Sequence, residues 1–270
     1  MIRKLILVLL TPFAIYSQID LKIQLLDSLT KKPIEFVNVG VLSKGFGTVT
    51  DENGFFHLNV ADSLKNNVLK ISCIGYESKT ISITKLVGLH TLLIKPSEVN
   101  LAEIKVFVKR KPKYKVLGND TKTKNIVAGF TANNLGSELA VKLNVKHPDT
   151  KLKSIKFNIT SNPFDSLVFR FNVYDMDAKG CPSKNILTQM ILIEPISKTG
   201  LVELNVDKYN IYTSSDVFIA IEWVKDLGDN KGLFFSSQLL GGGSYFRKAS
   251  QDKWEKVPTV GIGLSALVEY

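Results

Sequence analysis

The stretch Ile19-Asp20-Leu21-Lys22-Ile23-Gln24-Leu25 alternates apolar and polar residues without a break. Because successive side chains of a β-strand point to opposite faces of a sheet, a period of two predicts a strand with one buried face. Similar runs follow along the chain, separated by short stretches rich in turn-forming residues. The further strands predicted in the first part of the chain are 37–41, 56–60, 69–73, 81–83, 92–94 and 104–108.

The most distinct turn signal in this part is Asp51-Glu52-Asn53-Gly54. Asn53 and Gly54 both tolerate the positive φ angles of a type I′ turn, so this pair predicts a β-hairpin. About seven short strands in roughly ninety residues, each with one apolar face, favour two facing sheets. Residues 18–108 are therefore predicted to form a β-sandwich.

The second part of the chain, residues 125–270, shows the same alternation of apolar and polar residues. Eight or so strands separated by Gly-, Asn- and Asp-containing turns favour an antiparallel sandwich of jelly-roll type. The predicted fold class is thus all-β, with two antiparallel β-sandwiches. The strands predicted in this part are 139–145, 155–159, 167–173, 187–193, 202–206, 217–224, 233–236 and 260–270.

Three segments of the first part, Pro33–Val39, Gly47–Phe56 and Ile71–Glu77, resemble the carboxypeptidase-regulatory-like domain of Bacteroidetes envelope proteins in order and spacing. The resemblance covers roughly residues 18–108 and implies a small prealbumin-like sandwich that is not itself catalytic. The segment Leu101–Val106 is similar to the connector that precedes the plug of TonB-dependent outer-membrane transporters. No plug or barrel of several hundred residues follows, so transport is not expected of this chain.

The second part is similar to an uncharacterised C-terminal domain that accompanies the regulatory-like domain in some Bacteroidetes proteins. The segments that carry this likeness are Phe169–Tyr174 and Glu222-Trp223. The likeness implies no known activity.

Residues 1–17 show the three regions of a cleaved export signal. Arg3 and Lys4 precede an apolar run, and the small residue Ser17 precedes Gln18. A membrane-spanning helix needs about 20 apolar residues, whereas Pro12 interrupts this stretch. No Cys follows the run, so the lipobox of a bacterial lipoprotein is absent. We expect an exported mature chain that begins at Gln18 and has no transmembrane helix.

The net charge of +10 is concentrated in one segment. Residues 105–124 hold eight basic residues and a single acid, so the rest of the mature chain is nearly neutral and nucleic acid is not a predicted partner. Residues 109–124 are predicted to form a solvated linker between the two domains. The alternative is an anionic-surface contact, to lipid headgroups or acidic glycans, made by Lys109, Arg110, Lys111 and Lys113.

Residues that would carry catalysis are sparse. His57, His90 and His147 lie in different segments, so neither a metal site nor a cofactor is predicted. No Gly-x-Ser-x-Gly nucleophile motif is present, and Cys73 and Cys181 fall in different predicted domains. The sequence therefore favours a protein that is not an enzyme.

One aromatic group is a candidate ligand site. Tyr245, Arg247 and Trp254 follow the flexible stretch Gly241-Gly242-Gly243. Jelly-roll sandwiches often bind sugars by stacking them on exposed aromatic rings beside polar groups. The alternative is that these aromatic residues are packing residues at a strand end.

Together these observations predict an exported, non-enzymatic binding or scaffold protein of the bacterial cell envelope. Its location would be the periplasm, the outer membrane surface or the extracellular space, and its partner an envelope protein or a glycan. The alternatives are an envelope hydrolase and an accessory component of a TonB-dependent uptake system. A further alternative is a small outer-membrane β-barrel, because Val260–Tyr270 alternates like the closing strand of such barrels.

Overall fold

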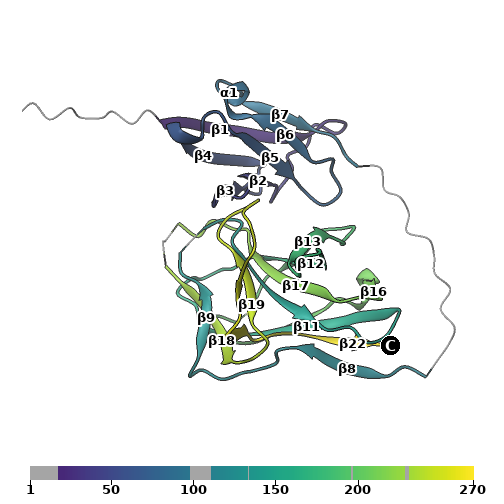
Figure 1. Cartoon of the computed structure of the whole chain (residues 1–270). Coiled ribbons are helices and arrows are strands. Elements are labelled where there is room, and N and C mark those ends of the chain that lie inside the picture. The colour runs from purple at the N-terminus through teal and green to yellow at the C-terminus, as the bar shows by residue number, and fades with distance from the viewer. Residues whose placement is uncertain (1–17, 98–110, 133, 196, 229–230) are drawn as a thin grey trace, which may run out of the picture.

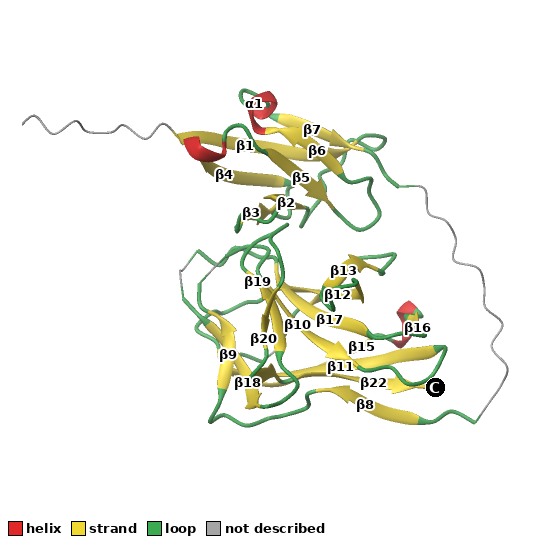
Figure 2. Cartoon of the chain, viewed as in Figure 1, coloured by secondary structure: helices red, strands yellow, loops and turns green. Residues whose placement is uncertain are grey.

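The structure is a computed structural model that describes residues 18–97, 111–132, 134–195, 197–228 and 231–270. The predicted export signal, the predicted strand 104–108, and Lys109 and Arg110 lie outside the described residues. The described chain is almost entirely β, as the sequence predicts, and falls into two units (Figures 1 and 2).

The N-terminal unit consists of two small sheets that share one buried core. The alternation predicted for the first strand is confirmed, because Leu21, Ile23 and Leu25 all point into this core. A short helix, α1 (Ile83–Leu86), precedes the last strand. The first sheet has the order β4 (Phe55–Ala61), β1 (Gln18–Asp27), β7 (Thr91–Ile94), and the second β3 (Phe46–Val49), β2 (Asn38–Val41), β5 (Val68–Ser72), β6 (Lys79–Ser82).

Two details differ from the prediction for this unit. β7 runs parallel to β1, so the sandwich is not wholly antiparallel. The Asn53-Gly54 turn does not close a hairpin, because β3 pairs with β2 whereas β4 pairs with β1. The chain changes sheets at this turn, where Asp51 accepts hydrogen bonds from the Asn53 and Phe55 amides.

The C-terminal unit is a larger sandwich of an eight-stranded and a seven-stranded sheet. The eight-stranded sheet runs β21 (Val260–Ile262), β18 (Leu233–Leu239), β11 (Thr150–Ser161), β22 (Leu264–Glu269), β8 (Tyr114–Gly118), with β15 (Gly200–Asn205) and β16 (Tyr212–Thr213) on β11 and β9 (Val127–Phe130) on β18. The seven-stranded sheet runs β13 (Pro182–Asn185), β12 (Phe169–Met176), β17 (Val217–Trp223), β10 (Glu138–Leu143), β19 (Ser244–Arg247), β20 (Glu255–Val257), with β14 (Ile191–Ile193) on β12.

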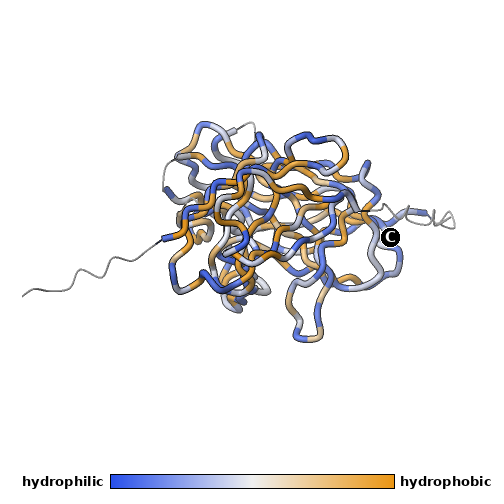
Figure 3. The backbone as a smooth tube through the Cα atoms, turned by 90° about the horizontal axis from the view of Figure 1, so that it is seen from above, coloured by the Kyte–Doolittle hydropathy of each residue, from blue (hydrophilic) through white to orange (hydrophobic). Residues whose placement is uncertain are grey.

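The core of the larger sandwich is rich in aromatic rings. Phe130 lies edge-on to both Trp223 and Phe235, and Phe157 lies edge-on to Phe169. Edge-to-face packing of this kind is favourable for aromatic pairs. Figure 3 shows hydrophobic positions mostly in the interior of the backbone trace and hydrophilic positions mostly in the loops at its outside.

The predicted linker is shorter than the sequence indicated. Residues 114–118, which the prediction placed in the linker, form the edge strand β8 and pair with β22. Lysines are tolerated on such a strand because one side of it faces solvent. The basic residues of this segment therefore led to the prediction of a linker where the structure has a strand. The long run predicted at 260–270 is likewise divided, into β21 and β22 on either side of Gly263.

The two units are packed together through residues 248–254, the loop between β19 and β20, which we call the docking loop (Figure 1). The Ser43 amide donates to the Gln251 carbonyl and the Gly45 amide to the Asp252 carboxylate, both within 3.0 Å. Two glycines of the N-terminal unit make room for this loop: a Cβ would lie 2.2 Å from the Ser250 carbonyl oxygen at Gly40 and 2.5 Å from it at Gly47.

We predict that Gly40→Ala loosens the docking loop from β2. The added methyl group cannot fit against a backbone oxygen, and overpacking of this kind costs about 1–3 kcal/mol. The checks are the free energy of unfolding and the rate of tryptic cleavage at Lys253, which should rise. Thr80→Ala, at an exposed position of β6, is the control. Equal effects of the two substitutions would contradict this account.

Candidate functional site

The outer face of the seven-stranded sheet carries four charged residues in one line across four neighbouring strands. Arg170 on β12 is the register partner of Glu222 on β17, which faces Glu138 on β10, which faces Arg247 on β19. We call these four residues the charged row. Their strand neighbours point to the opposite face and belong to the aromatic and aliphatic core. The two-residue period of the strands therefore places the four side chains together on the face that meets the N-terminal unit.

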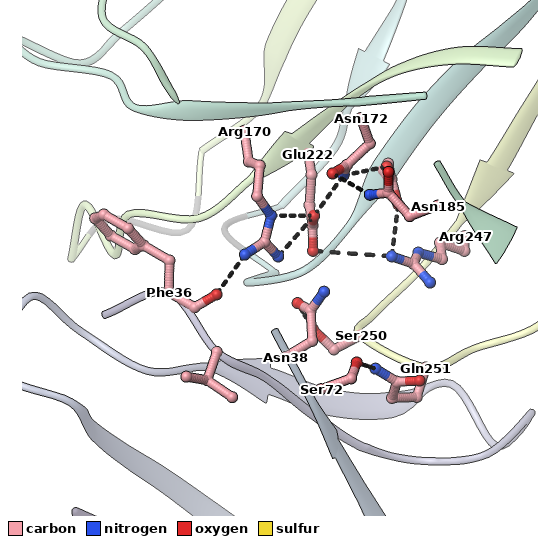
Figure 4. A network of polar contacts seen from close by, with 12 residues as sticks. Phe36, Asn38, Ser72, Arg170, Asn172, Asn185, Glu222, Arg247, Ser250 and Gln251 are labelled. Atoms are coloured by element: carbon pink, nitrogen blue, oxygen red, sulfur yellow. Dashed lines mark hydrogen bonds and ion pairs between the residues drawn. The ribbon is translucent and has the colours of Figure 1, made fainter. Parts of the chain in front are cut away.

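The four charges pair with one another, and Figure 4 shows Arg170, Glu222 and Arg247 of this row. Arg170 donates from Nε to Glu222 Oε2 at 2.9 Å, and Arg247 Nη2 lies 2.6 Å from Glu138 Oε2. The Asn172 amide group donates to both carboxylates, at 2.7 and 2.8 Å, and so links the two ion pairs. Tyr174 completes the set by donating from its hydroxyl to Glu138 at 2.9 Å.

Both carboxylates are removed from solvent, since Glu138 and Glu222 are 0% exposed. Burial raises the pKa of Glu138 to about 7, because it disfavours the charged form more than the Arg247 guanidinium restores it. The Glu222 carboxylate adds to this upward shift. Burial also raises the pKa of Tyr174 well above its usual value, and the Glu138 charge acts in the same direction. Tyr174 is thus fixed as a hydrogen-bond donor.

Arg170 joins the charged row to the N-terminal unit. Its Nη1 donates to the main-chain carbonyl of Phe36, whose φ angle of 53° turns that carbonyl out of the loop before β2. Thr50 holds the loop in this left-handed conformation: its hydroxyl accepts from the Val37 amide and donates to the Ile34 carbonyl. The apolar contacts around this junction are made by Phe36, Val49, Val168 and Val224.

A cleft of about 410 Å³ opens beside the charged row, between the two units. We call it the interdomain cleft. Its lining is dominated by amide, hydroxyl and basic side chains. The N-terminal unit supplies Asn38, Lys70, Ser72, Cys73, Tyr76 and Ser78, and the larger sandwich supplies Arg170, Asn172, Tyr174, Ser183, Lys184, Asn185, Arg247 and Gln251.

The N-terminal unit matches a known family. Residues 24–106 fit the model of the CarboxypepD_reg-like domain. The N-terminal unit is a CarboxypepD_reg-like domain. This confirms the resemblance seen in the sequence, and it places one wall of the interdomain cleft on a domain of known family. No curated protein matches the chain.

Among solved structures, the chain is similar to the cysteine protease and lectin-like domains of Cwp84, a surface layer associated protein of Clostridium difficile. The two share 11% sequence identity with a TM-score of 0.44, over 86% of this chain and 58% of that one. A structure of infectious bursal disease virus strain Gx shares 12% identity with a TM-score of 0.29, over 93% of this chain and 64% of that one. The chain spans less than two thirds of the length of either.

The predicted ligand residues Tyr245, Arg247 and Trp254 do lie together, but not as an exposed sugar platform. Tyr245 is only 5% exposed and packs edge-on against Phe218. Arg247 belongs to the charged row, with its guanidinium 5.2 Å from the centre of the half-buried Trp254 ring. The prediction of an exposed ring was wrong for Tyr245, because β19 lies inside the sheet rather than at a loop, whereas the half-buried Trp254 lies in the docking loop and its role in binding a ligand stays a prediction. Lys111 and Lys113, the described residues of the predicted anionic-surface contact, are exposed.

The charged row itself was missed by the sequence prediction. Its clearest signal was Glu222, a single charged residue within the otherwise apolar strand Val217–Trp223. A charge at the centre of a fully buried strand requires a partner. Arg170 offers the same signal within β12. Only the strand order, which brings β12, β17, β10 and β19 side by side, shows that these residues are partners.

The described residues contain no group of three or more His, Cys, Asp or Glu side chains placed to hold a metal ion. They also contain no helix that is long and apolar enough to cross a membrane.

We predict that the raised pKa of Glu138 makes stability fall as pH rises. In the unfolded chain this carboxyl loses its proton near pH 4.5, whereas in the folded protein it keeps the proton until about pH 7. Between these values the folded state binds more protons, so raising the pH destabilises it, on the order of 1–3 kcal/mol. Urea unfolding of the native protein and of Glu138→Gln at several pH values measures this. The difference in the free energy of unfolding between the native protein and Glu138→Gln should change between pH 4.5 and about pH 7. A difference that stays constant over this pH range would contradict the prediction.

Proposed function

We propose that this protein is an exported, non-enzymatic binding protein of the cell envelope that holds a hydroxyl-rich ligand, such as a glycan, in the interdomain cleft. The observation that carries the proposal is the cleft itself, a polar hollow of about 410 Å³ built from two domains that are packed together. Binding sites of small ligands typically lie at such domain interfaces and have volumes in this range.

The lining of the cleft suits a ligand with many hydroxyl groups. A sugar hydroxyl both donates and accepts hydrogen bonds, and the side chains of Asn38, Ser72 and Gln251 can meet it in either role. Lys70 and Lys184 add donors from opposite walls. Several of these groups already hold each other in place: Gln251 donates to Ser72, and Asn185 donates to Asn172, each at 2.8 Å. Groups held in this way lose little freedom when a ligand binds.

The cleft offers little for catalysis. One nucleophilic candidate is Cys73, and burial raises the pKa of this thiol, which keeps it in the unreactive protonated form. No histidine is among the described residues that line the cleft, whose other candidate side chains are serines, tyrosines and lysines. These features support a binding role over the alternative of an envelope hydrolase. Export is supported by the signal pattern in residues 1–17.

We predict that a glycan array identifies a ligand whose affinity depends on the cleft lysines. Lys70→Ala and Lys184→Ala each remove one charged hydrogen-bond donor, which is worth about 1.5–3 kcal/mol, so the affinity should fall at least tenfold. The melting temperature should stay unchanged, because both side chains reach solvent. Lys85→Ala, on the exposed side of α1, is the matched control. The proposal would be contradicted if no glycan on the array bound the protein. It would also be contradicted if Lys70→Ala and Lys184→Ala both bound the glycan as tightly as the native protein does.

A further inference from the structure

A second hollow lies between the two sheets of the larger sandwich and ends near the docking loop. It has a volume of about 420 Å³ and walls that are mostly apolar. We call it the apolar cleft. One wall is formed by Ala128, Val260 and Ile262 of the eight-stranded sheet, and the other by Leu139, Phe246 and Val257 of the seven-stranded sheet.

The apolar cleft exists because the two sheets do not cover each other completely. Val260 and Leu239 are register partners and therefore point to the same face, the one that forms the core further along the strands. Leu239 is nevertheless 56% exposed, since nothing packs over it at this end. The floor of the cleft is buried, as Phe130 and Ile262 show, so the hollow runs from an exposed apolar rim into the core.

Several polar groups in the walls are already engaged, although Arg247 Nε is buried without a hydrogen-bond partner. The Ser244 hydroxyl donates to the Val260 carbonyl at 2.9 Å and accepts from the Ile262 amide at 2.7 Å. Glu138 and Arg247, which also border the cleft, pair with each other in the charged row. The interior therefore offers a mainly apolar surface.

The rim of the apolar cleft carries a positive charge. Lys248 lies there with its side chain 61% exposed. The carboxylate of Glu255 is 4.0 Å from both Lys248 and Lys253, so two lysines share one acid and the group of three has a net charge of +1. An apolar hollow that ends at an uncompensated cation is complementary to an amphipathic anion.

We propose that the apolar cleft binds a medium-chain carboxylate of the fatty-acid type, with its chain between the two sheets and its carboxylate beside Lys248. This site borders the interdomain cleft only at Arg247, which lines both hollows, and it does not depend on the function proposed for the interdomain cleft.

The test is isothermal titration of the folded protein with decanoate and with 1-decanol, below the concentrations at which they aggregate. Decanoate should bind with one-to-one stoichiometry. Ala128→Phe, which fills the cleft, should abolish binding of both compounds, and Val260→Phe at the rim serves the same purpose if Ala128→Phe does not fold. Ala61→Phe, at the exposed end of β4, is the matched control.

Lys248→Gln tests the position of the carboxylate. This variant should weaken decanoate about tenfold and leave 1-decanol unchanged, whereas Lys85→Gln should affect neither. Absence of saturable decanoate binding would overturn the proposal. The proposal would also be overturned if a folded Ala128→Phe or Val260→Phe variant bound decanoate as tightly as the native protein does. The same holds if Lys248→Gln weakened the binding of decanoate and of 1-decanol equally.

Discussion

Glu138 and Glu222 face each other on adjacent strands, and neither has any exposed surface. Two carboxylates without hydration are tolerated only when cations and hydrogen-bond donors surround them, and here Arg170 and Arg247 flank them while Asn172 connects the two pairs. The strands that supply these residues come from distant parts of the chain. The requirement to neutralise this pair therefore constrains the order and register of the central strands of the larger sandwich.

The charged row also contacts the CarboxypepD_reg-like domain. Arg170 is held by Glu222 on one side and donates to the Phe36 carbonyl on the other, so the CarboxypepD_reg-like domain completes the environment that keeps the charged row dry. The docking loop fixes the domain at a second point, through its contacts with β2 and β5. The domains are thus attached at two separate points, on either side of the interdomain cleft. The apolar cleft arises from incomplete overlap of the two sheets, although Glu138 and Arg247 of the charged row and Lys248 of the docking loop also border it.

How far the sequence predicts this structure depends on the range of the interactions involved. Local alternation identified β1, β10 and β11, because burial of one face acts within a single strand, and a continuous apolar run identified β17. The family segments Pro33–Val39 and Gly47–Phe56 correctly indicated the N-terminal domain. Local signals failed where pairing between distant strands decides the structure. Asn53-Gly54 joins two sheets rather than two paired strands, and β8 was predicted as linker because of its lysines. Tyr245 was predicted to be exposed although its strand lies inside a sheet. The charged row depends on strand order and could not be predicted from spacing along the chain.

The most direct test of the central claim is a double-mutant cycle on the buried pair, measured as the free energy of unfolding in urea. Arg170→Met and Glu222→Met each leave an uncompensated buried charge, which costs about 3–5 kcal/mol. The double variant removes both charges, so it should be considerably more stable than the sum of the single losses predicts, with a coupling energy of several kcal/mol. Small, additive losses from the two single variants would contradict the claim that this pair holds the sheet and its neighbouring domain together.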